Sequence, residues 1–168
     1  LHVGHMRNAC LGAAVMNLYR FLGYNVISAT FPGDVGTHVA KCLWYLKYHN
    51  QEAEPTKDKG EWLGRMYSLG NLKLEDEENT HKSAENREKL TQILVQLETK
   101  QGEFYELWKR TREWSIELMK QTYAWAGIEF DRWYWESEMD SPSVQYVKDL
   151  YQQGKLVLSQ GAIGMDLE

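Results

Sequence analysis

Two histidines at the start of the chain are the residues best placed, by type and spacing, to do chemistry. His2 and His5 flank Gly4, and the residues from 5 to 22 have the apolar pattern of a helix. A helix N-terminus presents free N–H groups and the positive end of the helix dipole, so it attracts anions. Glycine lets a ligand approach the backbone closely. We therefore predict a phosphate-binding site here, with Asn8 as a further ligand contact.

Other interpretations of this HxGH motif stay open at this point. The two histidines can instead cap a helix, and a zinc site would need a third ligand that the nearby sequence does not offer. Cys10 and Cys42 lack CxxC spacing, which is typical of free thiols in a cytosolic protein. We predict no metal site built from protein ligands.

A glycine-rich turn provides the second group of candidates. The turn, residues 33–36, follows an apolar segment from Tyr24 to Phe31 that we expect to form a short buried strand. Ligands of α/β proteins bind at the carboxyl ends of strands, which makes Asp34 and His38 candidate substrate-binding residues. The alternative, which we favour for Asp34, is that it caps the helix predicted from Thr37.

The elements that must position these residues have the order of an α/β fold. The helix of residues 5–22 is apolar on most sides, which predicts that it is buried, and Gly23 ends it. A strand follows at 24–31 and a second helix at 37–49. A helix followed at once by a strand, with a glycine between them, is the repeating unit of a parallel sheet.

The middle of the chain is predicted to be a mainly helical insertion. Residues 51–60 are polar, and residues 71–89 carry a dense run of charges that indicates a solvated surface. Helical periodicity returns at residues 90–126, where Gly102 is expected to separate two helices. The predicted core stripe of the second one contains Phe104, Leu107, Trp108, Thr111, Ser115, Leu118, Thr122 and Trp125.

The last forty residues are predicted to return to the α/β core. Residues 130–138 alternate aromatic and polar types, which favours an extended segment with Trp133 and Trp135 packed on one face. Ser141 and Pro142 predict the start of a helix. Its expected buried face holds Val144, Val147, Leu150 and Tyr151. Residues 155–159 and 162–167 predict a hairpin.

Composition limits the classes of function. The chain has 168 residues, with 24 acidic and 19 basic side chains and a net charge of −5, which argues against a basic nucleic-acid groove. Lys109, Arg110 and Arg112 are interpreted as a solvated helix face. No apolar run approaches the roughly 20 residues of a membrane span. Both ends have the character of cuts within a longer protein.

Several ordered motifs together resemble the arginyl-tRNA synthetases, a family of class I aminoacyl-tRNA synthetases. Residues 1–8 are similar to the HIGH signature of the class, and residues 33–37 to a Gly-Asp-x-Gly-Thr turn of the family. The similarity continues at Leu107-Trp108, Phe130-Asp131 and Glu136-Ser137-Glu138, and it is weakest over residues 51–90. Many family members carry glutamine at the position of His38. The second signature loop and the anticodon-binding domain have no counterpart in the sequence given.

The resemblance implies a fold and an activity. The implied fold is α/β, a partial Rossmann-like (HUP-type) nucleotide-binding domain with a mainly helical connective insertion. It divides the chain into 1–50, the first half of the core, 51–129, the insertion, and 130–168, the return to the core. The implied activity is ATP-dependent ligation of arginine to tRNA(Arg) in protein biosynthesis. His2 and His5 would be catalytic, His2, Gly4, His5 and Asn8 would bind ATP, and Mg²⁺ would accompany the ATP.

The expected partners are thus ATP, arginine and tRNA(Arg), for a monomeric cytoplasmic protein without membrane contacts. We expect the given piece alone to be inactive. Two alternatives remain: another HxGH-bearing class I synthetase or nucleotidyltransferase, and a noncatalytic helical interaction module.

Overall fold

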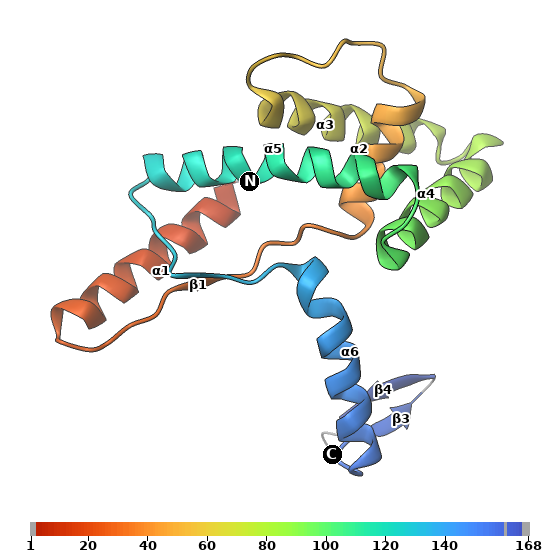
Figure 1. Ribbon diagram of the computed structural model, residues 1–168. Helices are drawn as coiled ribbons and strands as arrows, with labels where there is room; N and C mark the ends of the chain where they lie inside the picture. Colours follow the sequence, from red (N-terminus) through yellow and green to blue (C-terminus); the bar gives the residue numbers. More distant parts are fainter. Residues whose placement is uncertain (1–2, 160, 166–168) are drawn as a thin grey trace.

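The computed structural model describes residues 3–159 and 161–165, so His2 lies outside the described residues. Figure 1 shows the helices α2 to α5 packed together, the short strand β1 beside them, and the helix α6 with a hairpin extending away. The order of elements is α1 (Val3–Phe21), β1 (Ala29–Thr30), α2 (Thr37–Tyr48), α3 (Lys59–Glu77), α4 (Lys82–Thr99), α5 (Glu103–Trp125), β2 (Arg132–Trp133), α6 (Glu136–Gln152), β3 (Val157–Ser159) and β4 (Ala162–Gly164).

Helices α2 to α5 form a packed body, called the helical unit below. Helix α2 lies at its centre and contacts the other three helices. Its Leu43 and Trp44 are fully buried against Ile93 of α4 and against Phe104 and Trp108 of α5. The predicted helix at 37–49 and the two predicted helices of residues 90–126 are confirmed, and all three supply apolar side chains to this core.

Gly102 separates α4 from α5, as predicted. Its φ of 97° lies in the region that favours glycine, and it occupies the N-cap position of α5. The first turn of α5 is capped from the preceding helix, because the Gln96 side chain accepts a hydrogen bond from the Phe104 N–H at 2.9 Å. The break between α4 and α5 thus depends on the positive φ of Gly102 and on the hydrogen bond from the Phe104 N–H to the Gln96 side chain.

A second glycine allows two helices to approach closely. A Cβ atom added to Gly60 of α3 would lie 2.6 Å from the Leu118 Cβ and 2.7 Å from the Trp114 carbonyl oxygen, both on α5. Gly64, one turn further along α3, has no such neighbour within 4 Å. The absence of a side chain at Gly60 therefore sets the distance between α3 and α5.

The C-terminal end of α3 carries a buried carboxylate with a strongly lowered pKa. A hydrogen bond from Asn86, and then those from Lys73 and Lys82, lower the pKa of Glu77 from 4.5 to about 2. A carboxylate with a depressed pKa stabilises the fold above its unfolded-state pKa, and the stabilisation disappears as the pH falls toward the folded-state value.

We expect the urea midpoint of the protein to fall between about pH 4.5 and pH 2, partly because Glu77 must then be protonated. The variant Glu77→Gln should lose less stability over that interval, whereas Glu75→Gln, at an exposed position on the same helix, should follow the unmodified protein. Urea titrations at a series of pH values measure this, and identical pH profiles for the two variants would contradict it.

Two short sheets are present in the described residues, and one of them joins distant parts of the chain. Strands β1 and β2 pair in parallel, with Ala29 opposite Arg132. Next to them, the Asp131 carboxylate accepts hydrogen bonds from the Ser28 N–H at 2.8 Å and from Arg20 at 2.9 Å. The Ser28 hydrogen bonds are the main cause that lowers the pKa of Asp131. The parallel pairing agrees with the α/β expectation, although β1 is shorter than the strand predicted at 24–31.

Helix α1 forms as predicted, but the prediction that it is buried was wrong. None of its residues is buried by the described part of the chain, and Leu18 and Phe21 are 64% and 88% exposed. Apolar periodicity reports which faces a helix can bury, and it does not report which segments cover them. Figure 1 shows α1 extending away from the helical unit along most of its length.

The start of α6 also differs from the prediction at Ser141–Pro142. The helix begins at Glu136 and contains Pro142 in its interior. Its first N–H groups find acceptors on the loop after β1: Glu136 N–H donates to the Pro32 carbonyl and Ser137 N–H to the Asp34 carboxylate. These acceptors, distant in sequence, start the helix six residues earlier than its own residues indicate.

The predicted buried face of α6 is mostly open in the described structure, since Val144 is 47% exposed and no residue of the helix is fully buried. The predicted hairpin is confirmed, with Leu158 of β3 paired to Ile163 of β4.

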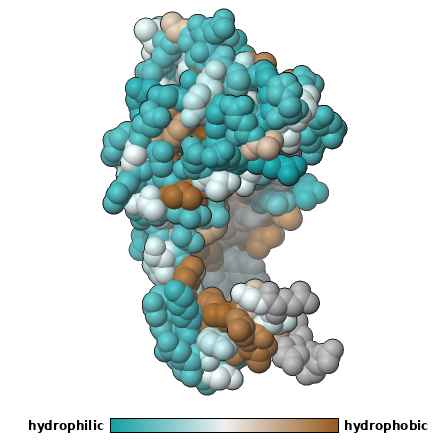
Figure 2. Space-filling view, turned by 90° about the vertical axis from the view of Figure 1, so that its right-hand side faces the viewer, coloured by the Kyte–Doolittle hydropathy of each residue, from teal (hydrophilic) through white to brown (hydrophobic). Residues whose placement is uncertain are grey.

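Figure 2 shows apolar side chains gathered in the lower part of the molecule, whereas the upper part is mainly hydrophilic.

Candidate functional site

An open hollow of about 1,140 Å³ lies between α1 and the helical unit. Its walls come from the first half of α1, from β1 and the loop after it, and from α2, α3 and α5. Four residues singled out in the sequence line it: His5, Asn8, Asp34 and His38. The fold therefore brings residues from both predicted motifs to one cavity.

The N-terminal turn of α1 forms one side of this cavity. Helix α1 begins at Val3, so Gly4 and His5 belong to its first turn, and Asn8 lies one turn further on. His5 and Asn8 are exposed. A helix start that borders an open cavity offers N–H groups and the positive end of the dipole to an anion there.

Asp34 joins three segments on another side of the cavity. Its carboxylate accepts hydrogen bonds from Arg112 Nε at 2.6 Å, from the Ser137 hydroxyl at 2.7 Å and from the Ser137 N–H at 2.9 Å. The carboxylate side chain is only 6% exposed. We call Asp34, Arg112 and Ser137 the Asp34 clasp.

The clasp corrects the prediction that Asp34 caps the helix beginning at Thr37. The N-cap residue of α2 is Gly36, which makes no side-chain capping hydrogen bond. Asp34 caps α6 instead, because Ser137 is the second residue of that helix. A carboxylate near a helix N-terminus is electrostatically favourable. The prediction that Asp34 caps a helix was therefore correct, but the helix that it caps is α6 and not α2.

Arg112 is the functional candidate that sequence reasoning missed. Lys109 and Arg110 are exposed and pair with Glu106 and Glu54, as expected for a solvated face. The Arg112 side chain is only 16% exposed, and its guanidinium lies 4.5 Å from the centre of the Trp135 ring and 5.4 Å from that of Trp108. No local signal distinguishes it, because its ion-pair partner Asp34 lies 78 residues before it in the chain and Trp135 lies 23 residues after it.

Two further side chains of α2 line the cavity near the clasp. His38 Nδ1 lies 2.9 Å from the Tyr67 hydroxyl of α3, within hydrogen-bond distance. Burial raises the pKa of the Cys42 thiol to about 12, so this cysteine stays protonated. His38 is thus oriented by a neighbour, whereas Cys42 contributes apolar surface.

The comparisons with known proteins agree with the motif analysis. The whole chain, residues 1–168, matches the family described as tRNA synthetases class I (R), catalytic domain. The chain belongs to this family. It is 64% identical over its full length to an arginine–tRNA ligase of Bdellovibrio bacteriovorus, and 33% identical over 99% of its length to one of Halothermothrix orenii. A relative of the same name from Borreliella afzelii is 30% identical.

The chain spans less than a third of the length of these relatives: 29% of the first and 28% of the other two. The chain therefore corresponds to one segment of each of these relatives. Of the described residues, no group of three His, Cys, Asp or Glu side chains is arranged to hold a metal ion. No helix in residues 3–159 is long and apolar enough to cross a membrane.

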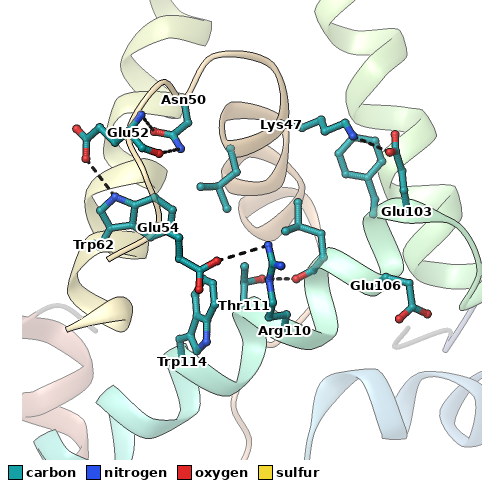
Figure 3. Close-up of a pocket in the computed structure, with 13 residues that line it drawn as sticks. Lys47, Asn50, Glu52, Glu54, Trp62, Glu103, Glu106, Arg110, Thr111 and Trp114 are labelled. Carbon is teal, nitrogen blue, oxygen red and sulfur yellow. Dashed lines mark hydrogen bonds and ion pairs between the residues drawn. The ribbon is translucent and has the colours of Figure 1, made fainter. Parts of the chain in front are cut away.

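A second, smaller hollow of about 520 Å³ lies on the other side of α5, between α2, α3 and the polar loop that joins them. Figure 3 shows that the charged groups around it already have partners: Glu54 with Arg110, Lys47 with Glu103, and Glu52 with the Trp62 indole. Because Arg110, Lys47 and Arg65 neutralise the charges of Glu54, Glu103 and Glu52, the cavity bordered by α1 is the better candidate site of this synthetase domain.

Proposed function

We propose that this chain is part of an enzyme that activates arginine with ATP and then transfers it to tRNA(Arg). The observation that carries the proposal is the 64% identity to an arginine–tRNA ligase over the whole chain. The cavity adds support, because the helix whose first turn contains Gly4 and His5 of the HxGH motif begins at its edge. The family's Rossmann-like fold is the architecture we propose for the complete domain, and the parallel β1–β2 pair is consistent with it.

In the proposed mechanism the arginine carboxylate attacks the α-phosphate of ATP, and pyrophosphate leaves. Negative charge grows on the phosphate oxygens in the transition state, so donors that are already positioned there lower the barrier. His2 and His5 donate these hydrogen bonds, and the first turn of α1 adds its dipole. Gly4 leaves room for the adenosine, and Asn8 contacts the nucleotide.

Mg²⁺ enters with ATP in this proposal and is held mainly by phosphate oxygens, which suits an ion that keeps several non-protein ligands. Asp34 and His38 remain predicted substrate-binding residues on the strength of their place in the cavity wall. The division into 1–50, 51–129 and 130–168, the monomeric state and the cytoplasmic location also remain predictions.

Arginine-dependent exchange of pyrophosphate into ATP tests the proposal in the intact protein. We expect exchange that saturates with arginine and is at least about 100-fold slower with lysine, because a site built to hydrogen-bond one head group leaves polar groups unpaired with another. Charging of tRNA(Arg) should follow. Exchange driven by a different amino acid would support another HxGH enzyme, and the absence of saturable ATP binding would support a noncatalytic module.

A further inference from the structure

We propose that Asp34 and Arg112 are positioning residues for the activation of arginine, acting through the Asp34 clasp in the wall of the cavity that the start of α1 also borders. This inference rests on the proposed function for the reaction that is positioned. Its geometric part, that one buried ion pair holds three segments together, rests on the structure alone.

The contacts of residue 34 hold α5 at two points one turn apart. The Asp34 carboxylate pairs with Arg112, and the Asp34 backbone carbonyl accepts a hydrogen bond from the Trp108 indole at 2.7 Å. On its other side the same carboxylate holds the first turn of α6 through Ser137. The helical unit is thereby attached to the loop after β1 and to the segment after β2.

These attachments define the shape of the cavity, because its wall contains Asp34, Arg112, Trp108 and Trp135. The Arg112 guanidinium lies against both indole rings, which is a favourable cation–π arrangement. The Arg112 side chain is therefore in contact with two aromatic rings and with the carboxylate that holds the N-terminus of α6.

We expect the clasp to favour phosphate binding at the start of α1. The N-terminus of α6 and a guanidinium both attract anions, and both border this region. The Asp34 carboxylate accepts a hydrogen bond from the N-terminus of α6 and neutralises the charge of the Arg112 guanidinium. The start of α1 borders the same cavity through Val3 and His5. Asp34 thus orients the site without competing for the nucleotide.

The test compares Arg112→Met, Asp34→Asn and the double variant with Arg110→Met in the intact protein. Arg110 is the matched control, because it lies on the same helix but forms its ion pair with Glu54 outside this cavity. Two quantities are measured: hydrogen exchange of the segment 131–140, which contains the Ser137 N–H, and the kinetics of pyrophosphate exchange per titrated active site.

We expect each clasp variant to speed hydrogen exchange of that segment by about 10-fold or more. We also expect kcat to fall about 10- to 100-fold with the KM for ATP and arginine changed less than about threefold, since small misplacements act mainly on the reacting geometry. The double variant should be no slower than the worse single one, because its members act as a unit. Arg110→Met should change neither quantity.

Each other outcome has a definite meaning. Unchanged hydrogen exchange in both single variants would show that the clasp does not hold α6. Faster hydrogen exchange with an unchanged kcat per active site would reduce the clasp to a structural contact and overturn the positioning role. If the unmodified protein shows no arginine-dependent reaction, the proposed function fails and the positioning role fails with it, while hydrogen exchange still reports on the ion pair.

Discussion

Replacing His5 by alanine in the intact protein is expected to slow arginine-dependent pyrophosphate exchange by about 30- to 1,000-fold. This corresponds to about 2–4 kcal/mol, the scale of one lost donor that is positioned in advance for the transition state. The expectation follows from the place of His5 in the first turn of α1, exposed at the edge of the cavity. Most of the loss should fall on kcat, because the charge it stabilises develops during the reaction.

His81 provides the control for this prediction. It is also exposed, but it lies before α4, it does not line the cavity, and it makes no side-chain cap. His81→Ala should leave the rate unchanged, and His5→Asn, which retains an N–H donor, should recover part of it. Equal rates for His5→Ala and the unmodified protein would remove His5 from the mechanism.

Replacing Gly60 by alanine is expected to destabilise the helical unit by about 1–3 kcal/mol. A Cβ at this position would lie 2.7 Å from a backbone oxygen of α5, and a backbone atom cannot move aside as a flexible side chain can. The two helices must separate, which loosens the packing along their contact. Urea unfolding followed by far-UV circular dichroism measures the change.

The matched substitution Gly64→Ala should act in the opposite direction. It lies on the same helix with open space where the new methyl group would be, so the helix preference of alanine is expressed without a clash. We expect a gain of about 0.5–1 kcal/mol. Similar effects of the two substitutions would mean that the approach of α3 to α5 at Gly60 is less close than described.

The local features of the fold could be predicted because their causes are local. Helical periodicity identified α2 and the residues of α4 and α5, and Gly102 marked the break between them. Turn residues identified the hairpin. The same method failed at Trp125, which was expected in the core but is 85% exposed. The buried position belongs to Tyr123, and Trp125 lies about 200° further round the helix.

The contacts of the candidate site could be predicted only in part. The Gly-Asp-x-Gly turn indicated that Asp34 would satisfy a helix N-terminus, but its partner, Ser137, lies 103 residues away. No periodic pattern reports a pairing at that distance. The burial of Arg112 was missed for the same reason, because its charge indicates solvent until the buried carboxylate of Asp34 is located.

The parallel pairing of β1 with β2 has a consequence for the modular design of the chain. The segment that leads into the helical unit and the one that leaves it are adjacent, since Ser28 and Asp131 are hydrogen-bonded to each other. A body whose entry and exit lie side by side is attached like an inserted domain, and such insertions tolerate changes of length. We therefore expect changes of length between α3 and α4 to leave the strand register and the Asp34 clasp intact.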